Sequence, residues 1–292
     1  MSAASWRLFL ALLTVYIVWG STYLGIRFAL EGGFPPFWLG AIRFFLAGSL
    51  MYAVLRARGY PRPTLPQWRN CALLGFLMLA VGNGMVNTAQ QYVSSGITAV
   101  AVASSALWIA LFATLRGERS SRTEWLGITI GFAGIILLNI DGELSASRIG
   151  LVALLIAPLS WAFASIWSRG RNLPAPFMAA AAQMLCASVI MFAIGLGNGE
   201  RFATLPSASG WLALFYLILF GSVFAYSAYV WLLQNARPAL VGSYAYVNPV
   251  IAVLLGAALA HERPGGKDLI AIVIILGGVL LITLSKTFRK KT

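Results

Sequence analysis

Three amide side chains interrupt an apolar stretch in the first third of the sequence. Asn83, Asn87 and Gln90 follow a spacing of i, i+4 and i+7, which places them on one face of a helix. A buried amide needs a hydrogen-bonding partner, a water molecule or a polar solute. The group therefore predicts either the lining of a solute cavity or hydrogen bonds between helices. Tyr244 and Asn248 repeat the i, i+4 spacing near the other end of the chain.

Aromatic and hydroxyl side chains form a second set of candidates for the lining of a cavity. Trp19 and Trp161 each fall near the middle of a long apolar run. Rings that combine an apolar face with a polar tip suit a pocket for a moderately apolar amino acid, although any one of them could equally be a core residue. The set is Trp19, Tyr23, Ser104, Trp108, Trp161, Ser165, Tyr226 and Tyr229.

Arginine is the only charged residue type that we find inside the apolar runs. Arg43 lies some two turns inside its run, where it could attract a solute carboxylate or pair with carbonyl groups at a helix end. Arg27 lies about one turn from the end of its run, so its long side chain can extend to the polar boundary. The eight acidic residues all fall in connections or at the ends of runs: Glu31, Glu118, Glu124, Asp141, Glu143, Glu200, Glu262 and Asp268.

The sequence lacks the groupings that metal, cofactor and enzyme sites need. Cys71 and Cys186 lie far apart in apolar runs, and the single histidine, His261, lies at the end of a run. Neither the separation of the cysteines nor the position of the histidine is typical of metal ligands. No nucleophile, set of metal ligands or pair of acidic residues occurs together inside the apolar runs. We therefore expect no metal, no cofactor and no catalytic residue, and an intramembrane enzyme remains the disfavoured alternative.

The composition indicates an integral membrane protein. Hydrophobic residues make up 60% of the chain and charged residues 10%, whereas charged residues are about 25% of a typical soluble domain. The apolar runs repeatedly reach the roughly 20 residues that span a bilayer as a helix. The net charge of +13 is spread over short connections, which argues against a nucleic-acid partner.

Apolar runs separated by polar or Gly/Pro-rich breaks predict ten transmembrane helices. Their expected bounds are approximately 7 to 30, 35 to 56, 68 to 91, 95 to 115, 122 to 140, 149 to 168, 175 to 197, 209 to 233, 238 to 260 and 267 to 285. With the N-terminus inside, the inner segments hold fifteen Lys and Arg residues and the outer loops hold four. This asymmetry predicts a multi-pass protein of the inner (plasma) membrane with both termini in the cytoplasm.

The two halves of the chain resemble each other at an offset of about 144 residues. Glu118 matches Glu262 (262 minus 118), and Trp19 matches Trp161 at an offset of 142. We expect two five-helix repeats, residues 1–145 and 146–292. Because five is odd, the second repeat enters the membrane from the opposite side. Inverted repeats around a central cavity are typical of secondary transporters.

The run endings carry a family resemblance. "ASSALWIALFATLRGERS" and "VGSYAYVNPVIAVLLGAALAHERP" both pass from small and aromatic residues to a Glu-Arg pair. Over essentially its whole length the chain resembles the drug/metabolite transporter superfamily, in its ten-helix branch of two EamA-type repeats. The resemblance implies transport of a small molecule, and the aromatic-rich interior is similar to that of the exporters of amino acids and related metabolites, including aromatic amino acids.

These observations together predict a secondary transporter of amino acids or similar neutral or zwitterionic metabolites. Alternating access would move the solute through a cavity lined by spans one, three, four, six, eight and nine, by export or uniport. Proton coupling usually needs a carboxylate deep inside a membrane span, and the apolar runs contain none. A proton-coupled multidrug or metabolite antiporter is therefore the less favoured alternative. The expected partners are the solute and the lipid bilayer; we expect a monomer, and a dimer remains open.

Four further positions have expected structural roles. Pro158 and Pro249 lie inside predicted helices and are candidate hinges, because proline removes a backbone donor. Glu118 and Glu262 are expected to cap helices and to pair with the adjacent arginines or with neighbouring loops. Glycines in "GITIGFAG" place small residues on one helix face, which predicts close helix packing or a dimer contact: Gly127, Gly131 and Gly134.

Overall fold

A computed structural model of the chain describes residues 3–117, 121–138, 147–236, 241–242, 244–262 and 265–288. Over these residues the protein is helical and contains no β-strand. Seven helical stretches are long and apolar enough to cross a membrane. Three further apolar helices, α8, α14 and α15, complete the ten segments that the sequence predicts.

The ten segments are here called spans 1 to 10. The first half contains α1 (Ala3–Thr14), η1 (Val15–Trp19) and α2 (Gly20–Glu31) in span 1, α3 (Pro36–Ala57) in span 2, α4 (Leu65–Leu74), η2 (Gly75–Asn83) and α5 (Gly84–Ala89) in span 3, α6 (Ser95–Ala103) and α7 (Ser105–Leu115) in span 4, and α8 (Arg122–Leu138) in span 5. The second half contains α9 (Arg148–Trp167) in span 6, α10 (Pro176–Gly197) in span 7, α11 (Ala208–Tyr216), η4 (Leu217–Tyr226) and α12 (Ser227–Asn235) in span 8, α14 (Tyr244–Leu259) in span 9 and α15 (Gly266–Phe288) in span 10.

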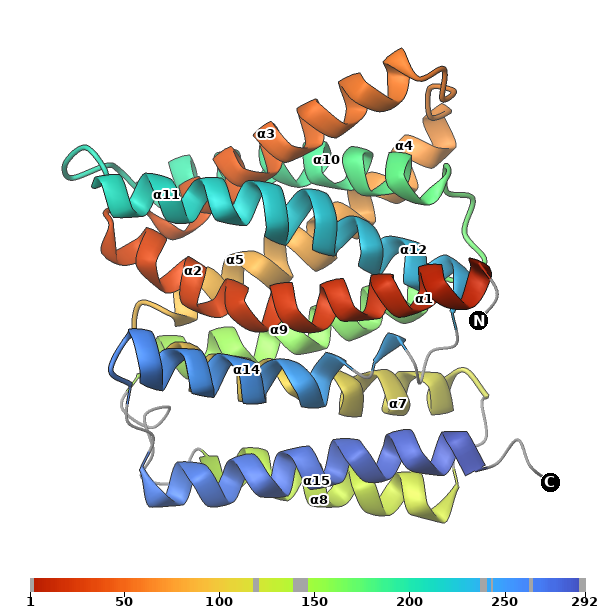
Figure 1. Cartoon of the computed structure of the whole chain (residues 1–292), viewed down its shortest axis with the longest axis vertical. Coiled ribbons are helices and arrows are strands. Elements are labelled where there is room, and N and C mark those ends of the chain that lie inside the picture. The colour runs from red at the N-terminus through yellow and green to blue at the C-terminus, as the bar shows by residue number, and fades with distance from the viewer. Residues whose placement is uncertain are drawn as a thin grey trace.

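Successive spans run in alternating directions, and α1 begins at the same end of the bundle as the one where α15 ends (Figure 1). We call this the inner end, after the orientation that the distribution of Lys and Arg residues predicts. The opposite end, at the left of Figure 1, is called the outer end and holds the connections after Glu31, Ala89, Gly197 and Leu259.

The two halves interlock, because the main packing partner of several helices lies in the other half. α3 packs along α10, α8 along α15, and α6 along α14. Other contacts follow the same symmetry. Span 1 packs on spans 8 and 9, and its equivalent in the second half, span 6, packs on spans 3 and 4. Spans 2 and 7, 5 and 10, and 4 and 9 thus meet as equivalent partners, which is the arrangement expected of two inverted repeats around a pseudo-two-fold axis.

The helices that surround the centre of the bundle are irregular at equivalent positions. Spans 3 and 8 contain the π-helical stretches η2 and η4, which begin 142 residues apart (217 minus 75). Span 1 contains the shorter π-helix η1, and the equivalent part of span 6 contains Pro158. Pro249 also lies within a helix, α14. Breaks in the regular α-helical hydrogen-bond pattern are a common cause of helix bends, and here they gather around the centre.

Glycines allow α8 and α15 to pack closely. A Cβ atom on Gly278 would lie 2.7 Å from both the carbonyl oxygen of Gly127 and the amide nitrogen of Gly131. Gly134, which matches Gly278 at the offset of 144, faces Ile275 of α15. The glycine face predicted from the sequence is therefore used within the chain, between spans 5 and 10.

Candidate functional site

A cavity of about 60 Å³ lies at the centre of the bundle. It is lined by residues from spans 1, 2, 3, 4, 6, 8 and 9: Trp19, Thr22, Tyr23, Ile26, Arg43, Phe44, Leu79, Gly82, Asn83, Val86, Val102, Ala157, Trp161, Gly221, Tyr226 and Tyr244. All six spans expected from the sequence take part, and span 2 joins them through Arg43 and Phe44. The lining contains no carboxylate among the residues that the structure describes.

Arg43 is the only charged residue among the described residues of that lining, and only 4% of it is exposed. Its Nε donates a hydrogen bond to Oγ of Ser222 over 2.7 Å, and its guanidinium lies 5.0 Å from the ring centre of Phe44. Gly221 makes room for the guanidinium, because a Cβ there would lie 2.8 Å from an Nη atom. The sequence left two roles open for Arg43: attracting a solute carboxylate or pairing with carbonyl groups at a helix end. Within the described residues its hydrogen bond goes to the Ser222 side chain and not to a helix-end carbonyl.

Arg43 has no acidic partner in the part of the chain that the structure describes. A buried cation without a counter-ion is costly, and proteins usually pair such charges. The Arg43 guanidinium is thus an unneutralised positive charge at the wall of a mostly aromatic cavity.

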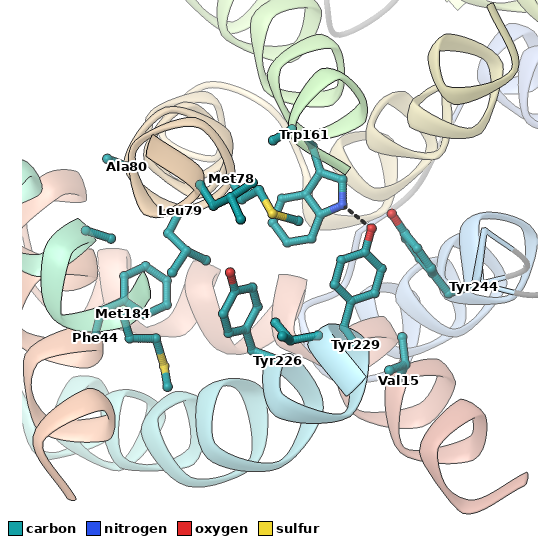
Figure 2. Close-up of a cluster of buried hydrophobic side chains, with 14 of the residues drawn as sticks. Val15, Phe44, Met78, Leu79, Ala80, Trp161, Met184, Tyr226, Tyr229 and Tyr244 are labelled. Carbon is teal, nitrogen blue, oxygen red and sulfur yellow. Dashed lines mark hydrogen bonds between the residues drawn. The ribbon is translucent and has the colours of Figure 1, made fainter. Parts of the chain in front are cut away.

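Four aromatic rings meet beside the cavity, those of Trp19, Trp161, Tyr229 and Tyr244. Figure 2 shows the last three of them. Trp19 lies within 5.5 Å, centre to centre, of Trp161, Tyr229 and Tyr244. Trp161 donates a hydrogen bond from Nε1 to the hydroxyl of Tyr229 over 2.9 Å, the dashed line in Figure 2. Ser165 joins the group through its hydroxyl, 3.0 Å from that of Tyr229. The repeat-equivalent tryptophans therefore form one cluster, with Trp19, Trp161 and Tyr244 facing the cavity.

Tyr226 connects the cavity lining to span 7. Its hydroxyl donates a hydrogen bond to Oε1 of Gln183, a buried residue of α10. Gln183 was not among the residues selected from the sequence, although a single polar side chain within "AAAAQMLC" is a usable signal. Ser222, Thr22 and Gly221 were also missed, because hydroxyls and glycines are common in membrane helices.

The three amides of span 3 share a helix face but do not share one cavity. Asn83 lines the central cavity. Asn87 donates from Nδ2 to the carbonyl of Pro36 over 2.9 Å and so ties α5 to the start of α3. Gln90 lies in a pocket at the outer end. The physical reason is depth: seven residues of helix rise about 10 Å, so one face can border two cavities.

Asn248 and Ser104 are buried outside the central cavity. The amide of Asn248 makes no hydrogen bond within the described residues, and Ser104 marks the break between α6 and α7. Trp108 stacks at 6.4 Å on Phe112 and likewise does not line the cavity. Six of the thirteen candidates for the cavity, and Arg43, therefore lie at the central cavity wall: Trp19, Tyr23, Asn83, Trp161, Tyr226 and Tyr244.

Two further cavities lie toward the two ends of the bundle. The inner one, of about 280 Å³, is lined by Gln183 and by Arg169 and Arg171 after span 6. It adjoins the central cavity at the Tyr226–Gln183 hydrogen bond, because Gln183 lines one cavity and Tyr226 the other. The outer pocket, of about 530 Å³, is lined by Arg27, Leu30, Glu31 and residues 90–94.

Two carboxylates cap the first turn of helices at the outer end. Glu262 accepts hydrogen bonds from Ser95 and Gly96 at the start of α6 and forms an ion pair with Arg27. Glu200 accepts from the backbone amides of Phe37 and Trp38 at the start of α3. The cap expected for Glu262 is observed, while Glu118, Arg119 and Arg263 lie outside the described residues. Arg27, expected to reach the polar boundary, lies at the outer end and bridges Glu262 and Glu31.

Burial and hydrogen bonding act on these two carboxyl groups in opposite directions. Burial raises the pKa of Glu200, and the amides of Trp38 and Phe37 offset only part of that effect. At Glu262 burial also opposes ionisation, but hydrogen bonds from Ser95, Gly96 and Arg27 outweigh it and lower the pKa below its ordinary value. The Glu262 carboxylate is therefore held ionised by its neighbours.

Comparison with known proteins assigns the fold to a family. The model of the EamA-like transporter family matches the chain twice, over residues 6–140 and 148–284. The chain belongs to the EamA-like transporter family. Each EamA match contains five of the ten spans, and the interlocked halves described above are these two matches.

Relatives of this EamA protein match nearly its whole length. The chain is 47% identical over 280 residues to a protein of Escherichia coli (strain K12) described as "Uncharacterized inner membrane transporter YedA", covering 96% of this chain and 91% of that protein. It is 26% identical to an "Uncharacterized transporter" of Archaeoglobus fulgidus, covering 94% and 96%. A protein of known crystal structure matches with a TM-score of 0.71 at 25% identity, covering 97% and 98%. The protein is accordingly a multi-pass membrane transporter.

Proposed function

We propose that this EamA-like protein moves amino acids, or similar small zwitterionic metabolites, across the inner membrane by alternating access. The observation that carries the proposal is the Arg43 guanidinium, which is buried in the wall of an aromatic cavity without an acidic partner among the described residues. A carboxylate is the natural counter-ion for such a group, because charge-assisted hydrogen bonds to guanidinium are short and strong. The solute would thus complete the pairing that the chain leaves open.

The rest of the lining suits the remainder of an amino acid. The rings of Trp19, Trp161 and Tyr244 offer apolar surface to a side chain, and their faces attract an ammonium group. Asn83 adds an amide that can donate and accept hydrogen bonds. A solute with a positive charge and no carboxylate would be repelled by Arg43, and the described lining has no carboxylate to offset that repulsion. This disfavours export of cationic drugs by proton exchange, the alternative left open by the sequence.

The sizes and positions of the three cavities support alternating access. The central cavity of about 60 Å³ is smaller than the roughly 300 Å³ of typical small ligand sites. It must therefore widen to admit a solute, and the inner cavity and outer pocket provide approaches from opposite ends. Two inverted repeats, for which we propose bounds of 1–145 and 146–292, can exchange conformations to open each side in turn. Bends at Pro158 and Pro249 are the proposed hinges.

The same proposal covers orientation and assembly. Both termini face the cytoplasm, because the inner end holds most of the Lys and Arg residues. A monomer suffices for transport, since one chain encloses the central cavity. The lack of a carboxylate in the described lining of that cavity argues against proton coupling and so supports uniport, and export is the direction that we propose.

Flux measurement in proteoliposomes tests the function directly. Purified protein is reconstituted, and counterflow of radiolabelled phenylalanine, tyrosine, leucine and alanine is compared with that of their amides, with and without a proton gradient. We expect saturable counterflow of at least one free amino acid, weaker transport of its amide and no dependence on the proton gradient. Strict dependence on a proton gradient would favour the antiporter, and the absence of flux for all carboxylates would refute the proposal.

A further inference from the structure

The barrier between the central cavity and the outer pocket is one helical turn thick. On span 1, Ile26 lines the central cavity and Arg27 lines the outer pocket. On span 3, Val86 lines the central cavity and Gln90, one turn further, lines the outer pocket. Part of a larger hydrophobic cluster lies in this region, and its members from spans 1, 3, 4 and 9 are Tyr23, Ile26, Val86, Ala99 and Ala252. Opening the cavity outward requires these spans to separate.

One carboxylate holds three of these spans together above that layer. Oε1 of Glu262 accepts hydrogen bonds from the amide and the hydroxyl of Ser95, over 2.8 and 2.7 Å, and from Arg27 over 2.5 Å. Oε2 accepts from the amide of Gly96 over 3.1 Å. Glu262 follows span 9, Ser95 and Gly96 begin span 4, and Arg27 belongs to span 1. Only 6% of the Glu262 side chain is exposed, so water competes poorly for these bonds.

The chain is built so that Glu262 folds back over the end of its own helix. His261 has a φ of 54°, the left-handed region that a residue with a Cβ seldom adopts. The amide of Glu262 then donates to the carbonyl of Gly256 over 3.1 Å. A Cβ on Gly256 would overlap Oε2 of Glu262, so glycine is needed there. Strain in the connection is tolerated because the carboxylate gains four hydrogen bonds.

We propose that Arg27 and Glu262 form the outer gate of the transport cycle, closed in this structure by the bonds of Glu262 to the start of α6. Outward opening breaks the contact between Glu262 and spans 1 and 4, after which the hydrophobic layer parts and the central cavity joins the outer pocket. Arg27 and Glu262 are gating residues: they set how often the cavity opens outward and do not bind the solute. The proposal rests on alternating access as the proposed function.

The test measures outward opening without any substrate. Val102, in the wall of the central cavity, is replaced by cysteine in a chain whose native cysteines are removed (Cys71→Ala, Cys186→Ala). A membrane-impermeant thiol reagent is applied to right-side-out and to inside-out vesicles. We expect Glu262→Gln to raise the labelling rate from the outer face roughly tenfold or more, because hydrogen bonds to a charged group are lost, and to lower it from the inner face.

Glu31→Gln is the matched control. Glu31 also pairs with Arg27, over 2.8 Å, but it lies on the same helix and its side chain is 54% exposed, so it joins no two spans. We expect its labelling rate to stay within about twofold of the parent chain, since exposed pairs contribute little. Arg27→Gln breaks the bridge from the other side while leaving the cap on α6, and it also raises outer labelling.

The outcomes separate the gate from the proposed function. Outer labelling that is unchanged in both Glu262→Gln and Arg27→Gln overturns the gate, whatever the flux. An equal rise in Glu31→Gln also overturns it, because the effect would then come from the charge of the outer pocket. Faster outer labelling in a protein that carries none of the tested amino acids supports the gate and refutes only the solute class.

Discussion

At the scale of single residues, two arginines within the spans have different surroundings. Arg27 bonds to two carboxylates at the outer end. Arg43 is more deeply buried, and its hydrogen bond goes to the neutral hydroxyl of Ser222. A buried charge without compensation lowers the free energy of unfolding. Packing alone therefore does not explain why an arginine occupies position 43. Under the proposed function, a solute carboxylate would supply that compensation only while it is bound.

Replacing Arg43 tests this idea. Arg43→Gln removes the charge and keeps a polar side chain, so we expect kcat/KM for a transported amino acid to fall about 10- to 100-fold, the value of a charge-assisted hydrogen bond. Transport of the corresponding amide falls much less, because it has no carboxylate to lose. Arg58→Gln, at the exposed inner end of span 2, serves as the control. An equal loss for acid and amide would contradict the assignment.

Acid conditions provide a test of Glu262 as a stabilising contact. Its pKa is lowered in the folded protein, so its contribution to stability is complete above the ordinary pKa of about 4.3 and is lost as pH falls through the lowered value. The Tm difference between the parent chain and Glu262→Gln in detergent should be constant from about pH 7 to pH 5 and shrink below about pH 4. A difference that disappears between pH 7 and pH 5 would show that the pKa of this carboxyl group is raised in the folded protein and not lowered.

Residue types and spacing predicted part of the candidate site. Trp19, Trp161 and Arg43 were found because large rings and charges are unusual near the middle of a span, and that rarity is visible in the sequence. Gln90 and Trp108 were placed in the cavity by helical phase, which says nothing about depth or about which neighbour faces the residue. The Arg27–Glu262 pair joins positions 235 residues apart, and no local pattern predicts such a contact.

At the scale of elements, irregularity is concentrated in the spans around the centre. η2 and η4 begin at equivalent positions of the two repeats, whereas spans 2, 5, 7 and 10 contain no π-helical stretch over their described residues. π-Helical turns occur frequently at functional sites. Hydrophobic runs predicted the existence of all ten spans because the bilayer imposes length and apolarity. They could not predict the π-helices, because hydrophobicity does not distinguish a π-helical turn from an α-helical one.

Neighbouring glycines in α15 allow the close packing of spans 5 and 10 to be tested. Gly278→Ala places a methyl group against the backbone of α8, so overpacking should cost about 1–3 kcal/mol and lower the Tm. Gly277 has open space where a Cβ would lie. Gly277→Ala should be neutral or slightly stabilising, since alanine favours a helix by up to about 1 kcal/mol over glycine. Equal effects in thermal unfolding assays would show that α8 and α15 do not pack as described.

At the scale of the whole molecule, alternation of ten spans places both ends of the chain on one side. We expect a phosphatase reporter, active only outside the cytoplasm, to be active when inserted after residue 203 and inactive after residue 60 or at the C-terminus. A fluorescent reporter that matures in the cytoplasm should give the opposite pattern. Phosphatase activity at the C-terminus would reverse the orientation and exchange the inner and outer ends.

The interlocking of the two halves also determines how the protein can assemble. When the first five spans have been synthesised, α3 and α8 still lack α10 and α15, the helices on which they pack. Neither half can bury its own surfaces, so an isolated half is expected to be degraded or to aggregate. The chain can be divided between residues 140 and 148 and the two fragments produced together. We expect them to associate into a functional transporter, as two subunits of a heterodimer would.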